Sequence, residues 1–107
     1  MKNVILIGAN GSTSKEMIPR LLEQADVRLR LFLRRASRLE NLKSDRVEIV
    51  AGDATHLSDL RGAIRREDIV ISTMGGLDLD VKTENIVRAM QHVGARRNRE
   101  QRRADHL

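Results

Sequence analysis

Two glycines and a serine at regular spacing, Gly8, Gly11 and Ser14, stand between an apolar run and a helical pattern. A glycine at the end of a strand permits a tight turn, and a second lets the backbone approach an anion closely. The amides of Ser12 and Thr13 lie where the helix would begin, and the helix dipole attracts negative charge there. The spacing therefore predicts a site for the pyrophosphate of a dinucleotide. A structural turn that contains two glycines is the alternative.

Two arginines, Arg34 and Arg35, follow the second apolar segment. Sites for NAD usually place an acidic residue at this point, where it binds the ribose 2′-hydroxyl. A guanidinium group instead suits a 2′-phosphate, and a charge-assisted hydrogen bond contributes about 1.5–3 kcal/mol. The pair therefore predicts that NADP(H) binds more tightly than NAD(H), by roughly ten- to hundredfold. A solvated basic loop is the alternative.

Polar residues and glycines also follow the third and fourth apolar segments. Asp53 would place a carboxylate near the adenine amino group, but a helix cap or a turn is the competing role. Residues 73–76, Thr-Met-Gly-Gly, end the fourth segment beside the first, where the strand order reverses. Backbone at such a switch point should line the ribose and pyrophosphate of a cofactor. A flexible glycine turn is the alternative there.

Composition limits the other kinds of chemistry. The 107 residues predict one domain, and 40% hydrophobic with 33% charged residues is a soluble balance. No apolar run approaches the roughly 20 residues of a membrane span, and the lack of a targeting signal predicts a cytoplasmic protein. The chain has no cysteine, which excludes disulfides and cysteine–zinc sites. His56, His92 and His106 lack metal-like spacing, so we expect surface or capping roles.

The candidate site residues follow apolar segments that alternate with helical patterns. We expect strands at 4–7, 27–33, 47–51 and 68–73, and helices at 16–25, 38–43, 57–64 and 81–93. This alternation predicts an α/β fold with a Rossmann-type parallel sheet, strand order 3-2-1-4 and helices on both faces. The second half of such a fold would be incomplete. Gly94 is a natural stop for the last helix.

Three details of these elements carry expectations of their own. Pro19 is costly deep in a helix, so the first helix should start late, near Glu16, or bend at the proline. Arg28 and Arg30 suggest that one face of the second strand is partly exposed. Ser58 or Thr55 would cap the helix at 57–64. Asp78 and Asp80 are expected in a loop and a helix cap.

The last twelve residues differ from the rest of the chain. Residues 96–107 contain five arginines and two acidic residues, and their only apolar residues are Ala104 and Leu107. A fifth buried strand needs a longer apolar run, so the sheet should stop at its fourth strand or take a strand from another chain. We therefore expect a dinucleotide-binding domain at 1–95 and a basic tail, disordered or aberrant, at 96–107. Because Phe32 is the only aromatic residue, nucleic acid is not the expected partner.

Taken in order, these segments resemble the NAD(P)H-binding, NmrA-like branch of the atypical short-chain dehydrogenase/reductase superfamily. The resemblance covers about residues 1–95 and rests on segments 4–14, 33–35, 52–53, 71–76 and 83–90. It implies that the turn holds the pyrophosphate, that arginines bind the 2′-phosphate, and that later residues lie by the adenine and the ribose. The implied cofactor-binding residues are Gly8, Asn10, Gly11, Ser12 and Thr13 in the turn, Arg34 and Arg35, Asp53 and Ala54, and Thr73, Met74 and Gly75.

Proteins of this family are oxidoreductase-like, or are cofactor-binding sensors that have lost turnover. A non-catalytic dinucleotide sensor or interaction module is therefore the alternative function for this chain. The resemblance ends after Gly94, where the family continues with an apolar fifth strand and a substrate half. The chain has no tyrosine, so the Tyr-x-x-x-Lys catalytic pair of typical members is absent and no catalytic residue is assigned. We hypothesise a truncated or frameshifted reductase, which the other reading frames past Gly94 would test. The incomplete sheet allows a homodimer.

Overall fold

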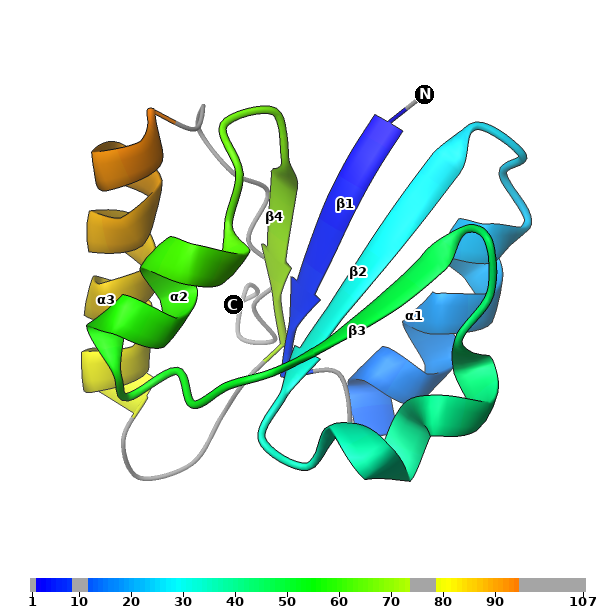
Figure 1. The fold of residues 1–107 in the computed structure, drawn as a ribbon, viewed down its shortest axis with the longest axis horizontal. Helices are drawn as coiled ribbons and strands as arrows, with labels where there is room; N and C mark the ends of the chain where they lie inside the picture. Colours follow the sequence, from blue (N-terminus) through cyan, green and yellow to red (C-terminus); the bar gives the residue numbers. More distant parts are fainter. Residues whose placement is uncertain (1, 9–11, 74–78, 95–107) are drawn as a thin grey trace.

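The structure is a computed structural model that describes residues 2–8, 12–73 and 79–94 of the chain. Strands and helices alternate along it, with one 3₁₀ helix, η1, between the second and third strands (Figure 1). In chain order the elements are β1 (Lys2–Ile7), α1 (Ser12–Leu22), β2 (Val27–Leu33), η1 (Ala36–Leu42), β3 (Val47–Ala51), α2 (Leu57–Ala63), β4 (Ile69–Ser72) and α3 (Leu79–Val93). The predicted order of strands and helices is confirmed.

The four strands form one parallel sheet in the order β3-β2-β1-β4, as the sequence predicts. Ile5 in β1 pairs with Arg30 in β2 on one side and with Val70 in β4 on the other. Ile5, Leu6 and Ile7 of the central strand are completely buried. A continuous apolar run is what a parallel strand needs when helices cover both faces of the sheet.

Helices cover both faces of this sheet (Figure 1). One core lies beneath α1 and η1 and contains Leu6, Ile18 and Leu31. The other lies beneath α2 and α3 and contains Ile5, Phe32 and Leu60. The alternation of side chains along each strand divides the apolar residues between the two cores. This arrangement is a Rossmann-type α/β fold.

The second strand differs from expectation at one residue. Arg28 is exposed, but Arg30 is only 5% exposed and forms ion pairs with Asp68 and Glu48. The expectation of a partly exposed face along both arginines is therefore wrong for Arg30. A buried guanidinium is tolerated because its partners replace the hydration that it loses. Asp68 lies just before β4, a segment that the strand pattern alone does not place near β2.

Helix boundaries supply two further corrections. α1 begins at Ser12 rather than near Glu16, and Pro19 lies inside it. Pro19 is exposed, whereas Ile18 packs in the core. Burial of the apolar face of α1 therefore offsets the helix hydrogen bond that Pro19 cannot donate. The N-cap of α2 is His56, without a side-chain cap hydrogen bond, rather than Ser58 or Thr55. Gly94 ends α3 with φ +80°, as expected.

Candidate functional site

The carboxyl ends of the four strands bring the candidate residues to one edge of the sheet. Ladder hydrogen bonds continue past the strand ends: the Gly8 amide donates to the Phe32 carbonyl at 3.0 Å, and the Gly52 amide donates to the Leu33 carbonyl at 3.0 Å. On the other side of β1, the Thr73 amide donates to the Ile7 carbonyl at 3.2 Å. In a doubly wound α/β fold, ligands bind at this edge, where the strand order reverses.

Gly8 turns the chain from β1 toward α1. Its φ is +89°, in the left-handed region that favours glycine, and α1 begins at Ser12. The first turn of a helix has free backbone N–H groups that attract anions, and the first turn of α1 contains no acidic residue. The backbone therefore supplies what the glycine pattern predicts, a helix N-terminus at the carboxyl end of the central strand.

Ser14 ties this turn to the neighbouring strand. Its side chain is completely buried, and its hydroxyl lies 2.9 Å from the Gly8 carbonyl and 2.6 Å from the Thr73 hydroxyl. A glycine usually stands at this place in the pattern, where it allows close packing of helix and strand, and Ser14 departs from it. Its bonding was missed because Thr73 is 59 positions away, and no local pattern connects the two hydroxyls.

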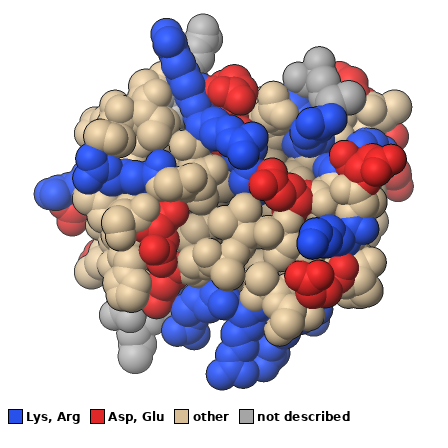
Figure 2. Space-filling model, in the orientation of Figure 1, with Lys and Arg blue, Asp and Glu red and all other residues tan. Residues whose placement is uncertain are grey.

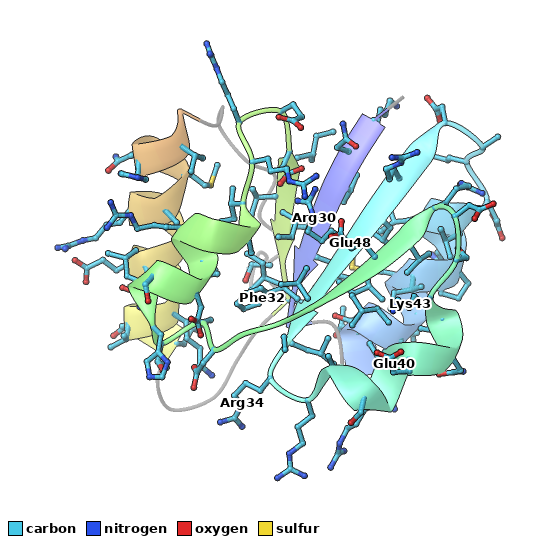
Figure 3. The ribbon with its side chains drawn as sticks, in the orientation of Figure 1. Arg30, Phe32, Arg34, Glu40, Lys43 and Glu48 are labelled. Atoms are coloured by element: carbon cyan, nitrogen blue, oxygen red, sulfur yellow. The ribbon has the colours of Figure 1, made fainter. Side chains whose placement is uncertain are left out.

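The arginines that follow β2 are at the surface of the molecule. Arg34 and Arg35 are both exposed, and Arg34 extends away from the end of β2 (Figure 3). In the same orientation, basic side chains gather along the lower edge of the molecule (Figure 2). Exposure leaves these guanidinium groups able to meet an anionic ligand, and Arg34 is close enough to Asp53 to affect its pKa.

Asp53 is held in a turn by Thr55. One oxygen of its carboxylate accepts a hydrogen bond from the Thr55 amide at 2.9 Å and another from the Thr55 hydroxyl at 2.7 Å. These bonds lower the pKa of Asp53 below its ordinary value, and the nearby charges of His56 and Arg34 lower it further. The geometry is that of the turn alternative, and a contact with adenine stays a prediction.

Of the other predicted residues, some are described by the structure and some are not. Ala54 is 4% exposed, and its carbonyl accepts a hydrogen bond from the Asn85 side chain at 3.0 Å, so it packs beneath α3. Thr13 is exposed in the first turn of α1, and Thr73 is half-buried. The residues Asn10, Gly11, Met74, Gly75, Asp78 and His106 lie outside the described residues, as does the side chain of Ser12.

The two histidines within the described residues show the surface positions that were expected. His56 and His92 are exposed, and a ring nitrogen of His92 accepts a hydrogen bond from the Arg61 guanidinium at 2.9 Å. Within residues 2–8, 12–73 and 79–94, no group of three His, Cys, Asp or Glu side chains is arranged to hold a metal ion. None of the helices in that part of the chain has the length and apolar character needed to cross a membrane.

Comparisons with solved structures support the fold. The chain is 28% identical to a Rossmann-fold NAD(P)-binding family protein from Shigella flexneri, with a TM-score of 0.83 over 92% of this chain and 50% of that one. A short-chain dehydrogenase/reductase from Veillonella parvula in complex with NADP is 20% identical, with a TM-score of 0.79 over 92% of this chain and 46% of that one. The triphenylmethane reductase of Citrobacter sp., complexed with NADP(H), is 21% identical, with a TM-score of 0.75 over 89% and 35% of the two chains.

This chain thus spans half or less of the length of these structures. Among curated protein sequences, none matches it significantly. The family model described as NAD(P)H-binding matches residues 8–98, which include the glycine turn, the strands β2, β3 and β4, and all the helices from α1 to α3. The chain therefore belongs to the NAD(P)H-binding family.

Proposed function

We propose that residues 1–95 form a domain that binds NADP(H) in preference to NAD(H). The observation that carries the proposal is the exposed guanidinium of Arg34, directly after β2 and beside the turn that follows β1. A cofactor with its pyrophosphate at the start of α1 would place its adenosine toward β2. The 2′-phosphate of NADP(H) would then lie within reach of Arg34, with Arg35 as a second cation.

Two further observations support this choice of cofactor. An acidic residue after β2 would bind the ribose diol of NAD(H), whereas this chain has Arg34 and Arg35 there. Two of the structurally similar proteins, from Veillonella parvula and Citrobacter sp., are described in complex with NADP or NADP(H). The turn residues that would hold the pyrophosphate are Gly8, Asn10, Gly11, Ser12 and Thr13.

The reaction class that fits this cofactor is hydride transfer. The chemistry belongs to the nicotinamide, and the protein supplies binding and orientation. We therefore propose that the chain is an oxidoreductase-type domain. The competing function is a dinucleotide sensor or interaction module that binds NADP(H) without turnover. Oxidation of NADPH by the chain in the presence of candidate carbonyl substrates would distinguish the first from the second. A cytoplasmic location and a homodimer stay predictions.

Calorimetric titration with NADPH and with NADH tests the cofactor directly. We expect NADPH to bind at least tenfold more tightly, and Arg34→Ala to remove most of that preference while NADH affinity is unchanged. Arg28→Ala is the matched control, because Arg28 is an exposed arginine on the same strand but at its amino-terminal part. Equal affinity for the two cofactors would exclude the 2′-phosphate role. Binding of neither, by a chain with a native circular dichroism spectrum, would remove the cofactor assignment.

A further inference from the structure

Three oxygen atoms from distant parts of the chain meet behind the glycine turn. The Ser14 hydroxyl lies 2.9 Å from the Gly8 carbonyl oxygen and 2.6 Å from the Thr73 hydroxyl. The Thr73 hydroxyl lies 3.5 Å from the same carbonyl oxygen. Ser14 is completely buried, whereas Thr73 is half-buried. The three groups therefore form a hydrogen-bonded series that begins inside the molecule and ends at a residue with access to the surface.

The number of hydroxyl hydrogen atoms determines which group donates and which accepts in this hydrogen-bonded series. Each hydroxyl has one hydrogen to donate, and the Gly8 carbonyl has none. Ser14 donates to Gly8 at 2.9 Å, because 3.5 Å from Thr73 is beyond the ordinary range for a hydroxyl donor. The hydrogen between the two hydroxyls must then come from Thr73. The Thr73 hydroxyl then has no hydrogen left to donate, and its oxygen can only accept hydrogen bonds from a ligand.

The position of Thr73 indicates which part of a dinucleotide it would meet. β2 and β4 lie on opposite sides of β1. If the pyrophosphate lies at the turn after β1 and the 2′-phosphate lies by Arg34 after β2, the second nucleoside extends toward the end of β4. Thr73 follows that strand directly. This step rests on the proposed function.

We propose that the Gly8–Ser14–Thr73 relay holds the Thr73 hydroxyl as an acceptor for a hydroxyl of the nicotinamide-side ribose. Thr73 is the residue that binds the ligand, and Ser14 is a positioning residue, because its buried hydroxyl has no access to the ligand. Without the Ser14 oxygen, the Thr73 hydrogen loses its acceptor, and its hydroxyl is free to rotate. The serine that replaces the usual third glycine thus gives the turn a polar connection to β4.

The test compares two ligands that share one half. NADPH carries both nucleosides, whereas adenosine 2′,5′-bisphosphate carries only the half expected near β2. We expect Ser14→Ala and Thr73→Val each to weaken NADPH binding three- to tenfold and to change adenosine 2′,5′-bisphosphate binding less than twofold. Thr73→Ser keeps the hydroxyl and should restore NADPH affinity. In the double variant, the two losses should not multiply, because they remove the same hydrogen bond.

Ser72→Ala is the matched control, since it removes a buried hydroxyl from the adjacent residue outside the relay, and NADPH affinity should stay unchanged. Equal weakening of both ligands in the Ser14 and Thr73 variants would mean that the relay only braces the turn, and would overturn the ribose contact. Unchanged NADPH affinity in both variants would overturn the relay while leaving the proposed function intact. Failure of the unmodified chain to bind NADPH would overturn both.

Discussion

The guanidinium of Arg30 and the carboxylate of Asp68 form an ion pair inside the protein, with 2.6 Å between Nη1 and Oδ2. The two side chains are 6% and 0% exposed. The same guanidinium nitrogen donates to the Ala63 carbonyl at 3.1 Å, and the Arg65 amide donates to the Asp68 carboxylate at 2.7 Å. The pair therefore joins β2 to the segment that connects α2 with β4, on the face covered by α2 and α3.

Arg30→Met is expected to destabilise the fold strongly. The substitution leaves the Asp68 carboxylate buried without its counterion, and loss of one partner of a buried pair costs about 3–5 kcal/mol. Chemical denaturation measures the change in the free energy of unfolding. A second substitution, Asp68→Leu, in the Arg30→Met background should recover part of the loss, because it removes the uncompensated charge.

Glu48→Gln supplies the control for that prediction. Glu48 also pairs with Arg30, at 3.3 Å, but its side chain is 54% exposed (Figure 3). Exposed pairs contribute about 0–1 kcal/mol, so the free energy of unfolding should hardly change. An effect of Glu48→Gln as large as that of Arg30→Met would contradict the role assigned to burial.

The same pair shows where prediction from the sequence ends. The strand at 27–33, the strand order and the alternation of elements follow from local apolar patterns, and the structure confirms them. The burial of Arg30 does not follow, because its partner Asp68 is 38 positions away and arginine in a strand usually indicates an exposed face. Local periodicity records which face is apolar, but it carries no information on which charges meet across the fold.

At the candidate site, too, some features follow from the local sequence and others depend on contacts between distant segments. The left-handed Gly8 and the exposed Arg34 follow from spacing and residue type, whereas the start of α1 at Ser12 does not, because Pro19 led to the expectation of a later start. The Ser14–Thr73 bond and the Asn85 bond to the Ala54 carbonyl depend on contacts between distant segments. These contacts are set by how the helices pack on the sheet, which the sequence pattern gives only in outline.

Gly52→Ala is expected to destabilise the protein by about 1–3 kcal/mol, as overpacking in a core does. A Cβ atom on Gly52 would lie 2.5 Å from Cε2 of Phe32, and the Phe32 ring is buried, so it has little room to move. Phe32→Leu in the Gly52→Ala background should cost less than the two separate losses together, because the smaller side chain relieves the clash. Thermal and denaturant unfolding both measure the effect.

Gly62→Ala is the matched control for Gly52. Gly62 lies inside α2, and a Cβ atom there would meet nothing within 4 Å. Alanine in a helix interior is more favourable than glycine by about 0.5–1 kcal/mol, so this variant should be slightly more stable than the unmodified chain. Destabilisation by both alanines would mean that the Phe32 contact is not the cause.

Asp53 gives the stability of the protein a dependence on acid pH. Hydrogen bonds from Thr55 lower the pKa of Asp53 in the folded protein, whereas the unfolded chain has the ordinary value of 3.8. The ionised carboxylate therefore stabilises the fold above that value, and its contribution is lost as the pH falls through the lower pKa of the folded state. The stability difference between the unmodified chain and Asp53→Asn should be largest near neutral pH and should narrow below about pH 4.

Thr55→Val tests the cause of this dependence. Removal of the Thr55 hydroxyl deletes the largest contribution to the lowered pKa of Asp53 and leaves the Thr55 amide bond in place. In this background, the pKa of Asp53 in the folded protein lies closer to 3.8, so the acid-dependent loss of stability should be smaller and should be complete at a higher pH. Urea unfolding at pH values from 2 to 7 measures it, and a profile that is unchanged by Thr55→Val would assign the acid dependence to other carboxylates.

Gly8→Ala should affect both stability and cofactor binding, and comparison with Gly94→Ala separates the two effects. Both glycines have positive φ, +89° and +80°, so alanine at either position adds roughly 1–2 kcal/mol of backbone strain. Gly94 ends α3, whereas Gly8 forms the turn that leads into α1. Equal losses in unfolding free energy are therefore expected, but only Gly8→Ala should weaken NADPH binding, because a Cβ atom and a changed turn alter the path to the amides of α1. If both variants retain NADPH affinity, the pyrophosphate does not depend on the conformation of Gly8, and the glycine at this position is there for the turn alone.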